Sequence, residues 1–199
     1  KVFDNPEPGL EEYLYLDYII ETGDAYGIDF VFNYDLPSIN LYAVYSLGKT
    51  TRWDGVQTYS PVFDRRHNVN LVGSYKFGKT RLWEFDVRWN MGSGFPFTQT
   101  QGFYEQYTFQ NGTASDVVNS NGELGIVYGD LNGGRLPYYH RLDLTLKREI
   151  ILSTNSTLEA NIGVTNAYNR ENIFYFDRVN FERVNQLPFM PSAGLKVNF

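Results

Sequence analysis

The stretch Arg81–Met91, RLWEFDVRWNM, decides the fold because two kinds of side chain alternate along it. From Trp83 onward, the odd positions are large and apolar, and the even positions between them are charged or polar. The two sets are Trp83, Phe85, Val87, Trp89 and Met91 on one side, and Glu84, Asp86, Arg88 and Asn90 on the other. Successive side chains of a β-strand point to opposite faces, so this period of two predicts a strand with one apolar and one charged face.

The same alternation recurs along most of the chain and predicts about eight strands in all. The other segments are Glu11–Ile20, which is the weakest, Gly27–Tyr34, Asn40–Leu47, Asn68–Phe77, Arg141–Ile150, Leu158–Thr165 and Gly194–Phe199. No segment has a helical pattern, and Asp116–Tyr128 predicts a loop with one short strand. We therefore predict an all-β fold with antiparallel strands.

Short and long connections alternate between the predicted strands. The short ones are Asp35–Ile39, Gly78–Thr80 and a turn around Asn155, and the long ones are Trp53–Asp64, Phe95–Pro137 and Asn169–Pro191. A membrane-spanning β-barrel has tight turns on one side and long loops on the other. A structureless loop as long as Phe95–Pro137 is uncommon in a compact soluble domain. The connections therefore favour an antiparallel transmembrane β-barrel.

Strand length and aromatic content favour the same interpretation. Segments such as Asn40–Arg52 exceed the five or six residues usual for globular strands. Aromatic residues make up 17% of the chain, and many stand near predicted strand ends, where barrels carry interfacial belts: Trp53, Tyr59, Phe77, Trp83, Phe95, Phe97, Tyr138, Tyr139, Phe174 and Phe176. A soluble β-sandwich also alternates, with its apolar face in a core, and it stays open as an alternative.

Composition excludes several classes of function. The chain has no cysteine, which excludes disulfides and thiol chemistry, and its net charge of −6 argues against nucleic acid as the main partner. The chain contains no run of about 18 apolar residues, so the sequence predicts no transmembrane helix.

Few residues suggest catalysis or metal binding. His67 and His140 each stand beside an arginine, and we expect packed interfacial or lumenal imidazoles rather than metal ligands. We expect Arg66, Arg141 and Asp143 to form lumenal hydrogen-bonded pairs. The carboxylates of Glu84 and Asp86, two residues apart, fit a hydrated wall better than a glycosidase pair. The sequence predicts no enzyme, no cofactor and no metal site.

Five blocks of the sequence carry a family resemblance. By their order and spacing they resemble the last strands of a TonB-dependent outer-membrane receptor of the Bacteroidota type, over nearly all of Gly27–Phe199. The blocks are RRHNVNLVGSYKFGK, WNMGSGFPFTQTQGFYE, RLPYYHRLDLTLKREI, LEANIGVTNAYNRENIF and LPFMPSAGLKVNF.

The resemblance implies a larger protein than these 199 residues. Such receptors are barrels of about 22 strands closed by an N-terminal plug. Residues 1–199 would be the C-terminal part of that barrel, about eight strands, with the plug and the earlier strands not in this chain. The implied location is the outer membrane of a Gram-negative bacterium.

The resemblance also implies active import of a scarce ligand, which could be a siderophore, a vitamin, a glycan or a peptide. The implied partners are outer-membrane lipid, the remaining barrel strands and plug, TonB through the missing N-terminal part, and the barrel assembly machinery; a surface lipoprotein lid is also allowed. Two alternatives stay open, a complete eight-stranded structural barrel and a soluble β-sandwich binding module.

Two groups of residues are candidate sites. By resemblance, the alternating residues Leu195, Val197 and Phe199 at the end of the chain are the signal read by the barrel assembly machinery, because an exposed strand edge offers main-chain pairing. Three aromatic residues of the longest loop could stack on a ligand at the barrel mouth or pack between loops: Tyr104, Tyr107 and Phe109.

Overall fold

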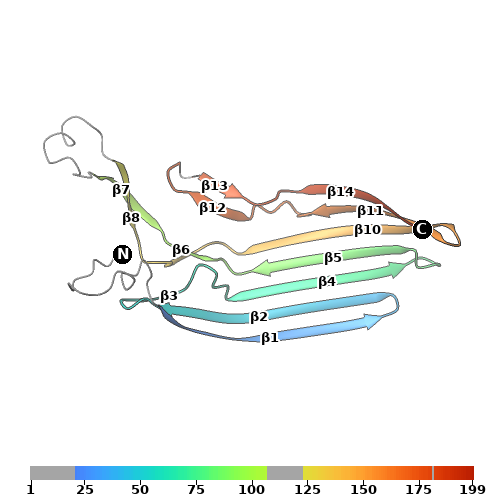
Figure 1. Ribbon diagram of the computed structural model, residues 1–199, viewed down its shortest axis with the longest axis horizontal. Coiled ribbons are helices and arrows are strands. Elements are labelled where there is room, and N and C mark those ends of the chain that lie inside the picture. The colour runs from blue at the N-terminus through green and yellow to red at the C-terminus, as the bar shows by residue number, and fades with distance from the viewer. Residues whose placement is uncertain (1–20, 107–122, 181) are drawn as a thin grey trace, which may run out of the picture.

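The computed structural model describes residues 21–106, 123–180 and 182–199, and in these ranges the chain is all-β without a helix (Figure 1). Seven strands are long: β1 (Thr22–Leu36), β2 (Ile39–Trp53), β4 (His67–Phe77), β5 (Trp83–Gly92), β10 (Tyr139–Ser153), β11 (Ser156–Thr165) and β14 (Met190–Asn198). The others are short: β3 (Thr58–Tyr59), β6 (Pro96–Phe97), β7 (Thr100–Gln106), β8 (Glu123–Tyr128), β9 (Gly134–Arg135), β12 (Ile173–Asp177) and β13 (Glu182–Asn185).

The seven long strands form one antiparallel sheet in the order β1-β2-β4-β5-β10-β11-β14, with β3 added beside β2. Each long strand pairs with the long strand that follows it in the chain, so the sheet is a meander. The prediction of an all-β antiparallel fold is confirmed. The weak strand expected over Glu11–Ile20 lies outside the described residues.

Tight turns and long connections lie at opposite ends of this sheet. In Figure 1 the three tight turns, residues 37–38, 78–82 and 154–155, are at the right-hand end, and the long connections are at the left-hand end. The predicted alternation of connections is confirmed. In the β4–β5 turn Gly78 has φ 87°, a left-handed conformation that a residue without Cβ adopts at no steric cost.

The two longest connections differ from the expected loops. The segment Phe95–Pro137, expected to be a long loop with one short strand within Asp116–Tyr128, contains the pairs β6–β9 and β7–β8, and the segment Asn169–Pro191 contains the hairpin β12–β13. β8 lies within Asp116–Tyr128, so that short strand is confirmed. The other short strands have two to seven residues, too few for a period of two to stand out in the sequence.

Strand register joins the alternation of single strands into two faces of the whole sheet. Residues opposite one another in neighbouring strands share a face. One row of such residues is apolar: Ile39, Tyr75, Phe85, Leu146, Ile162 and Ala193. The next row is polar or small: Lys76, Glu84, Lys147, Asn161 and Gly194. We call these two sides the apolar face and the polar face.

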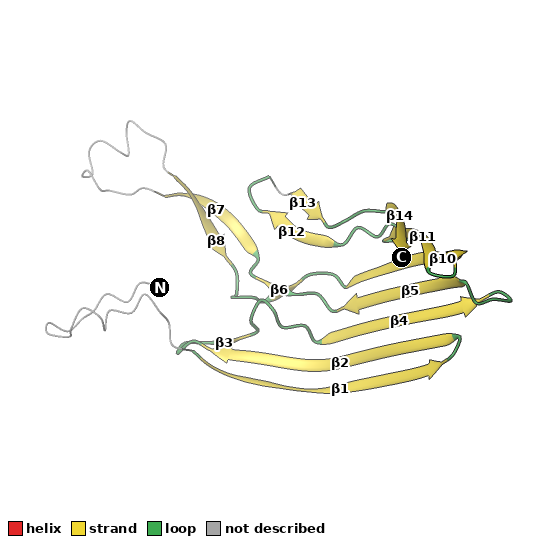
Figure 2. Ribbon diagram, turned by 45° about the vertical axis from the view of Figure 1, so that its right-hand side comes forward, coloured by secondary structure: helices red, strands yellow, loops and turns green. Residues whose placement is uncertain are grey.

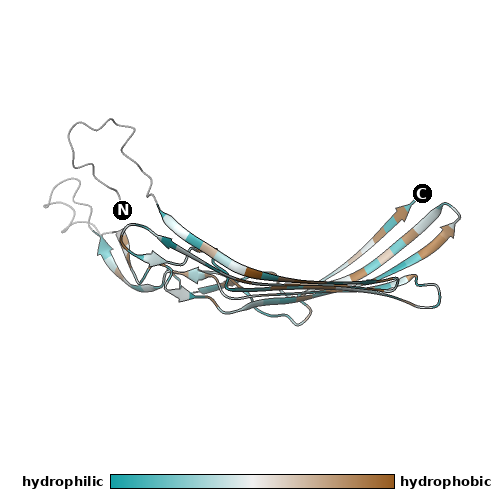
Figure 3. Cartoon of the chain, turned by 90° about the horizontal axis from the view of Figure 1, so that it is seen from below, coloured by the Kyte–Doolittle hydropathy of each residue, from teal (hydrophilic) through white to brown (hydrophobic). Residues whose placement is uncertain are grey.

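The sheet is curved and open. Figures 2 and 3 show that the strands next to the C-terminus turn away from the plane of the other strands, and Figure 3 shows hydrophobic and hydrophilic bands alternating along them. In the described part of the chain, β1 and β14 each pair with a long strand on one side only. Both edges therefore present unpaired backbone groups.

No hydrophobic side chain is buried in the described ranges. Ile162, in the middle of the apolar face, is 61% exposed, and large apolar residues of every long strand are exposed as well. The buried polar side chains are Asp64, Ser93, Asn166 and Asn172, all in or beside the long connections. Side-chain burial therefore concentrates at the loop end, while the apolar face has no protein cover.

Candidate functional site

The polar face carries a ladder of ion pairs across three strands. Lys147 of β10 places its Nζ 3.0 Å from Glu84 Oε1 and 2.7 Å from Asp86 Oδ2 of β5, and Lys76 of β4 lies 3.7 Å from Glu84 Oε2. The two carboxylates thus share one ammonium group, as paired charges in a hydrated wall do. Farther along the same face, Arg141 lies 2.9 Å from the carboxylate of Asp143, so the expected pairing of these two residues is confirmed.

The apolar face carries aromatic clusters at both ends. At the turn end, Phe77 stacks on Tyr75 at 5.9 Å and on Trp83 at 6.1 Å between ring centroids, and the Arg148 guanidinium lies 4.7 Å from the Trp83 ring. At the loop end, Tyr45 stacks on His67 at 6.2 Å. The rows between the clusters are mostly aliphatic, with Trp89 among them; the aliphatic residues are Leu41, Leu71, Val87, Leu142, Leu144 and Val164.

Both histidines belong to the loop-end cluster. The Tyr45 hydroxyl lies 2.9 Å from His67 Nδ1, and the Tyr168 hydroxyl lies 2.7 Å from His140 Nδ1. The register puts His67 opposite Leu47 and His140 opposite Met91, which is the apolar face. Of the two expected positions for these imidazoles, the structure selects the border of the apolar face.

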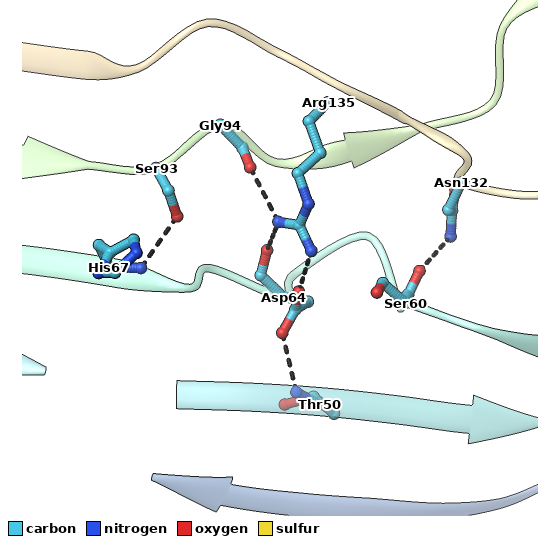
Figure 4. A network of polar contacts seen from close by, with 8 residues as sticks. All are labelled: Thr50, Ser60, Asp64, His67, Ser93, Gly94, Asn132 and Arg135. Carbon is cyan, nitrogen blue, oxygen red and sulfur yellow. Dashed lines mark hydrogen bonds and ion pairs between the residues drawn. The ribbon is translucent and has the colours of Figure 1, made fainter. Parts of the chain in front are cut away.

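A network of polar contacts ties the long connections together at the loop end (Figure 4). Its centre is Asp64, 2% exposed, whose carboxylate accepts a hydrogen bond of 2.8 Å from the Thr50 amide and forms an ion pair with Arg135 of β9. Arg135 also donates to the carbonyl oxygens of Asp64 at 3.3 Å and of Gly94 at 3.2 Å. One buried carboxylate and one guanidinium thus join three segments that are distant in sequence.

The electrostatics of Asp64 follow from its partners. Burial alone would raise the pKa of its carboxyl, but the hydrogen bonds from Arg135 and Thr50 and the charge of Arg135 outweigh that effect and lower the pKa below 3.8. The carboxylate is therefore ionised wherever the fold is intact near neutral pH. Because the pair stays charged, it holds the connections in one arrangement.

Two further contacts complete this network. Asn132 Nδ2 donates to the Ser60 carbonyl at 2.8 Å, and the His67 amide donates to Ser93 Oγ at 3.0 Å. Beside them, Gly94 passes so close to Leu136 that a Cβ would lie 1.5 Å from the Leu136 carbonyl oxygen. A side chain at Gly94 would push these two segments apart.

Asparagine side chains hold the connection after β11 in place by hydrogen bonds to its backbone and to β10. Asn166 is fully buried; its Nδ2 donates to the carbonyls of Arg170 at 2.9 Å and Leu187 at 3.0 Å, and its Oδ1 accepts from the Arg170 amide at 2.9 Å. Asn172 exchanges two hydrogen bonds with the backbone of His140, at 3.1 and 2.9 Å. The sequence analysis missed these anchors, although asparagines spaced by three in TNAYNREN were a signal.

A cleft of about 450 Å³ lies at the loop end, between the residues that follow β5, the start of β10 and the connection that carries β12 and β13. We call it the arginine cleft, because Arg65, Arg170 and Arg183 line it together with a single acidic residue, Glu171. Aromatic residues complete its wall: Phe95, Tyr138, Tyr139 and Tyr168. The cleft was not predicted from the sequence, because its arginines come from two distant connections, Arg65 from the one before β4 and Arg170 and Arg183 from the one after β11.

The predicted ligand-binding aromatics do not line this cleft as far as they are described. Tyr104 lies on β7, half exposed, with its ring against Gly125 of β8, where a Cβ would lie 2.5 Å from the ring. Figure 1 shows the β7–β8 pair standing away from the main sheet. Tyr107 and Phe109 lie outside the described residues.

The residues predicted as an assembly signal lie on the edge strand or just beyond it. Leu195 and Val197 are exposed on β14, and Phe199, which follows that strand, is 98% exposed. Among the described strands β14 pairs with β11 alone, so its outer edge is free for main-chain pairing. The geometry that the assembly hypothesis needs is therefore present, and the recognition itself stays a prediction.

The expected belt aromatics lie in several places, and three of them, Phe95, Tyr138 and Tyr139, line the arginine cleft. Phe77 and Trp83 belong to the turn-end cluster of the apolar face. Phe174 and Phe176 lie on β12 instead, and Phe176 contacts Phe97 of β6 at 5.9 Å between ring centroids. These last residues help to pack two long connections against each other.

The described ranges contain no cluster of three histidine or acidic side chains placed to hold a metal ion. They also contain no helix that is long and apolar enough to cross a membrane. No protein-family model, no curated protein and no solved structure matches the chain.

Proposed function

We propose that this chain is part of an outer-membrane β-barrel of the TonB-dependent receptor type, which takes up a scarce ligand into a Gram-negative cell. The observation that carries the proposal is the uncovered apolar face of the sheet of seven long strands, with no hydrophobic side chain buried among the described residues. Water is a poor solvent for so large a continuous apolar surface. Hydrocarbon chains of a bilayer are the partner that matches its chemistry.

The dimensions of the apolar face support this proposal. Along β4 the two aromatic clusters are separated by ten residues, from His67 to Phe77. At about 3.4 Å per residue and a tilt of 35–45°, this separation corresponds to a height of about 24–28 Å. An outer-membrane barrel has an apolar band of about 25 Å between its aromatic girdles.

The polar face and the sheet edges support the same proposal. The ladder formed by Lys76, Glu84, Asp86 and Lys147 suits a water-filled or plugged interior. Unpaired backbone groups in hydrocarbon cost several kcal/mol each, so the free edges of β1 and β14 need further strands in a bilayer. An open sheet of seven long strands fits a segment of a large barrel better than a nearly closed small one.

Nitroxide labels on neighbouring residues test which face meets lipid. The chain has no cysteine, so Val87→Cys and Arg88→Cys each create one labelling site on adjacent residues of β5. In reconstituted bilayers we expect the label at position 87 to collide with oxygen, which concentrates in lipid, and the label at position 88 to collide with a water-soluble nickel complex. A label at position 87 that is shielded from both reagents would indicate a dry protein core and refute the proposal.

A further inference from the structure

The arginine cleft contains cationic groups that the fold itself does not neutralise. Glu171 pairs with Arg183, which leaves Arg65 and Arg170 without a carboxylate partner in the described part of the chain. The Nε atoms of both residues are buried and have no hydrogen-bond partner among the described residues. Arg170 Nη2 donates a hydrogen bond of 2.9 Å to the Tyr138 carbonyl oxygen.

Aromatic rings hold Arg65 in the cleft. Its guanidinium lies 4.2 Å from the Phe95 ring centroid and 5.7 Å from that of Tyr139. It also fills the space over Gly92, where a Cβ would lie 2.5 Å from Arg65 Cζ. Cation–π contacts fix the orientation of a guanidinium but leave its N–H donors free. Arg65 is therefore positioned in advance for an acceptor.

The burial of Arg65 has an energetic consequence. Burial lowers the pKa of its guanidinium below its ordinary value, and the charge of Tyr139 only partly opposes this effect. A partly desolvated cation without a counter-ion is unfavourable, and an anion that enters the cleft removes that cost. Carboxylate and phosphate groups match the fork of a guanidinium and accept two of its N–H bonds at once.

We propose that the arginine cleft binds a small anionic ligand, whose carboxylate or phosphate group contacts Arg65 and Arg170 while its remaining atoms pack on Phe95 and Tyr138. The volume of about 450 Å³ suits a small molecule. This inference rests on the proposed function, because the anion reaches the cleft either as an imported acidic solute or as a headgroup of the surrounding membrane. Three arginines against one glutamate make the cleft cationic in a chain whose net charge is −6.

The anionic group could belong to a free solute or to the headgroup of a lipid. His140 and Tyr168 line the cleft at the border of the apolar face, so a phosphate of an outer-leaflet lipid could also reach it. The test uses the native polypeptide, which in the proposal supplies the remaining barrel strands, in zwitterionic phosphatidylcholine nanodiscs with citrate and inorganic phosphate as solute probes. A second set of nanodiscs contains diphosphoryl lipid A as the competing headgroup.

Isothermal titration with these probes measures the affinity of the wild-type chain and of variants. We expect Arg65→Gln and Arg170→Gln each to weaken binding of the preferred anion at least about tenfold, since each removes charged hydrogen bonds. Arg88→Gln is the matched control, because Arg88 is a cation of the polar face of β5, away from the cleft lining. Loss of solute binding in the lipid A discs would support the proposal with a headgroup as the ligand, and unchanged binding would support it with a solute.

Two results would overturn the inference. One is the absence of binding for citrate, phosphate and lipid A alike, and the other is binding that Arg88→Gln weakens as much as Arg65→Gln. Circular dichroism of each variant checks that the β-fold is retained. The outcome is separate from that of the nitroxide experiment, because the labels at positions 87 and 88 report on lipid contact whether or not an anion binds.

Discussion

At the scale of single residues, the buried polar side chains of the described ranges lie in or beside the long connections. Asp64 is the clearest case, since its carboxylate contacts the end of β2 through Thr50 and the strand β9 through Arg135. The partners are 14 and 71 residues away in sequence, so this one side chain links parts of the fold that no local pattern relates. A residue of this kind controls the arrangement of loops rather than the formation of strands.

The lowered pKa of Asp64 makes a prediction about acid stability. A carboxyl group with a folded pKa below its unfolded value of about 3.8 stabilises the fold above that pH, and the contribution disappears as the pH falls through the folded value. We therefore expect the loop end to loosen below about pH 3.8 in the wild type. In Asp64→Asn we expect the free energy of local unfolding of the loop end to be lower by about 1–3 kcal/mol already at pH 7. The loss stays in this range because the Arg135 side chain is 36% exposed and water screens part of the ion pair.

The rate at which an acid-stable protease cleaves within residues 54–66 at pH 7 and at pH 3 measures this effect. Asp130→Asn is the control, since Asp130 is an exposed acidic residue of a neighbouring turn. The idea fails if Asp64→Asn is cleaved no faster than Asp130→Asn at pH 7.

At the scale of elements, the connection from β11 to β14 depends on Asn166. Its φ of 55° is left-handed, a conformation that asparagine tolerates better than alanine. The side chain also satisfies three backbone groups of residues 170 and 187. The hairpin β12–β13 is thereby held above the arginine cleft by hydrogen bonds rather than by an apolar core.

Asn166→Ala should release this connection. We expect a loss of about 1–3 kcal/mol in local stability, from unsatisfied buried backbone groups and from strain at a positive φ. Hydrogen–deuterium exchange of residues 167–189 should rise by one to two orders of magnitude, while exchange in β1 and β2 stays unchanged. Asn180→Ala removes an exposed hydrogen bond of 3.0 Å to Asp177, and equal exchange in the two variants would contradict the role of Asn166.

At the scale of the whole molecule, the sheet has an uncovered apolar face and two unpaired edges among its described strands. In the proposed barrel, the apolar face contacts hydrocarbon and the two edges pair with further strands inside the bilayer. The polar face, with ion pairs such as Lys147–Asp86 at 2.7 Å, is suited to line an interior. Together these three features support the proposal of a large barrel over a soluble sandwich.

The native polypeptide tests the transporter proposal at this scale. We expect the protein purified from outer membranes to carry, in the same chain, an N-terminal plug, earlier barrel strands and a short segment that contacts TonB. Intact-mass measurement and peptide mapping of the native polypeptide check this expectation. A native chain that forms a membrane barrel without a plug would contradict active import and favour a structural barrel instead.

The sequence by itself determined the strands and their faces. The period of two in segments such as Arg81–Met91 depends on neighbours within one strand, and turn residues such as those near Gly78 act locally, so both can be read without a structure. Only the tertiary structure revealed the Asp64–Arg135 pair, the short strands of the long connections other than β8, and the arginine cleft. The residues that form them are tens of positions apart in the sequence. Such contacts depend on how the connections pack, which no local periodicity encodes.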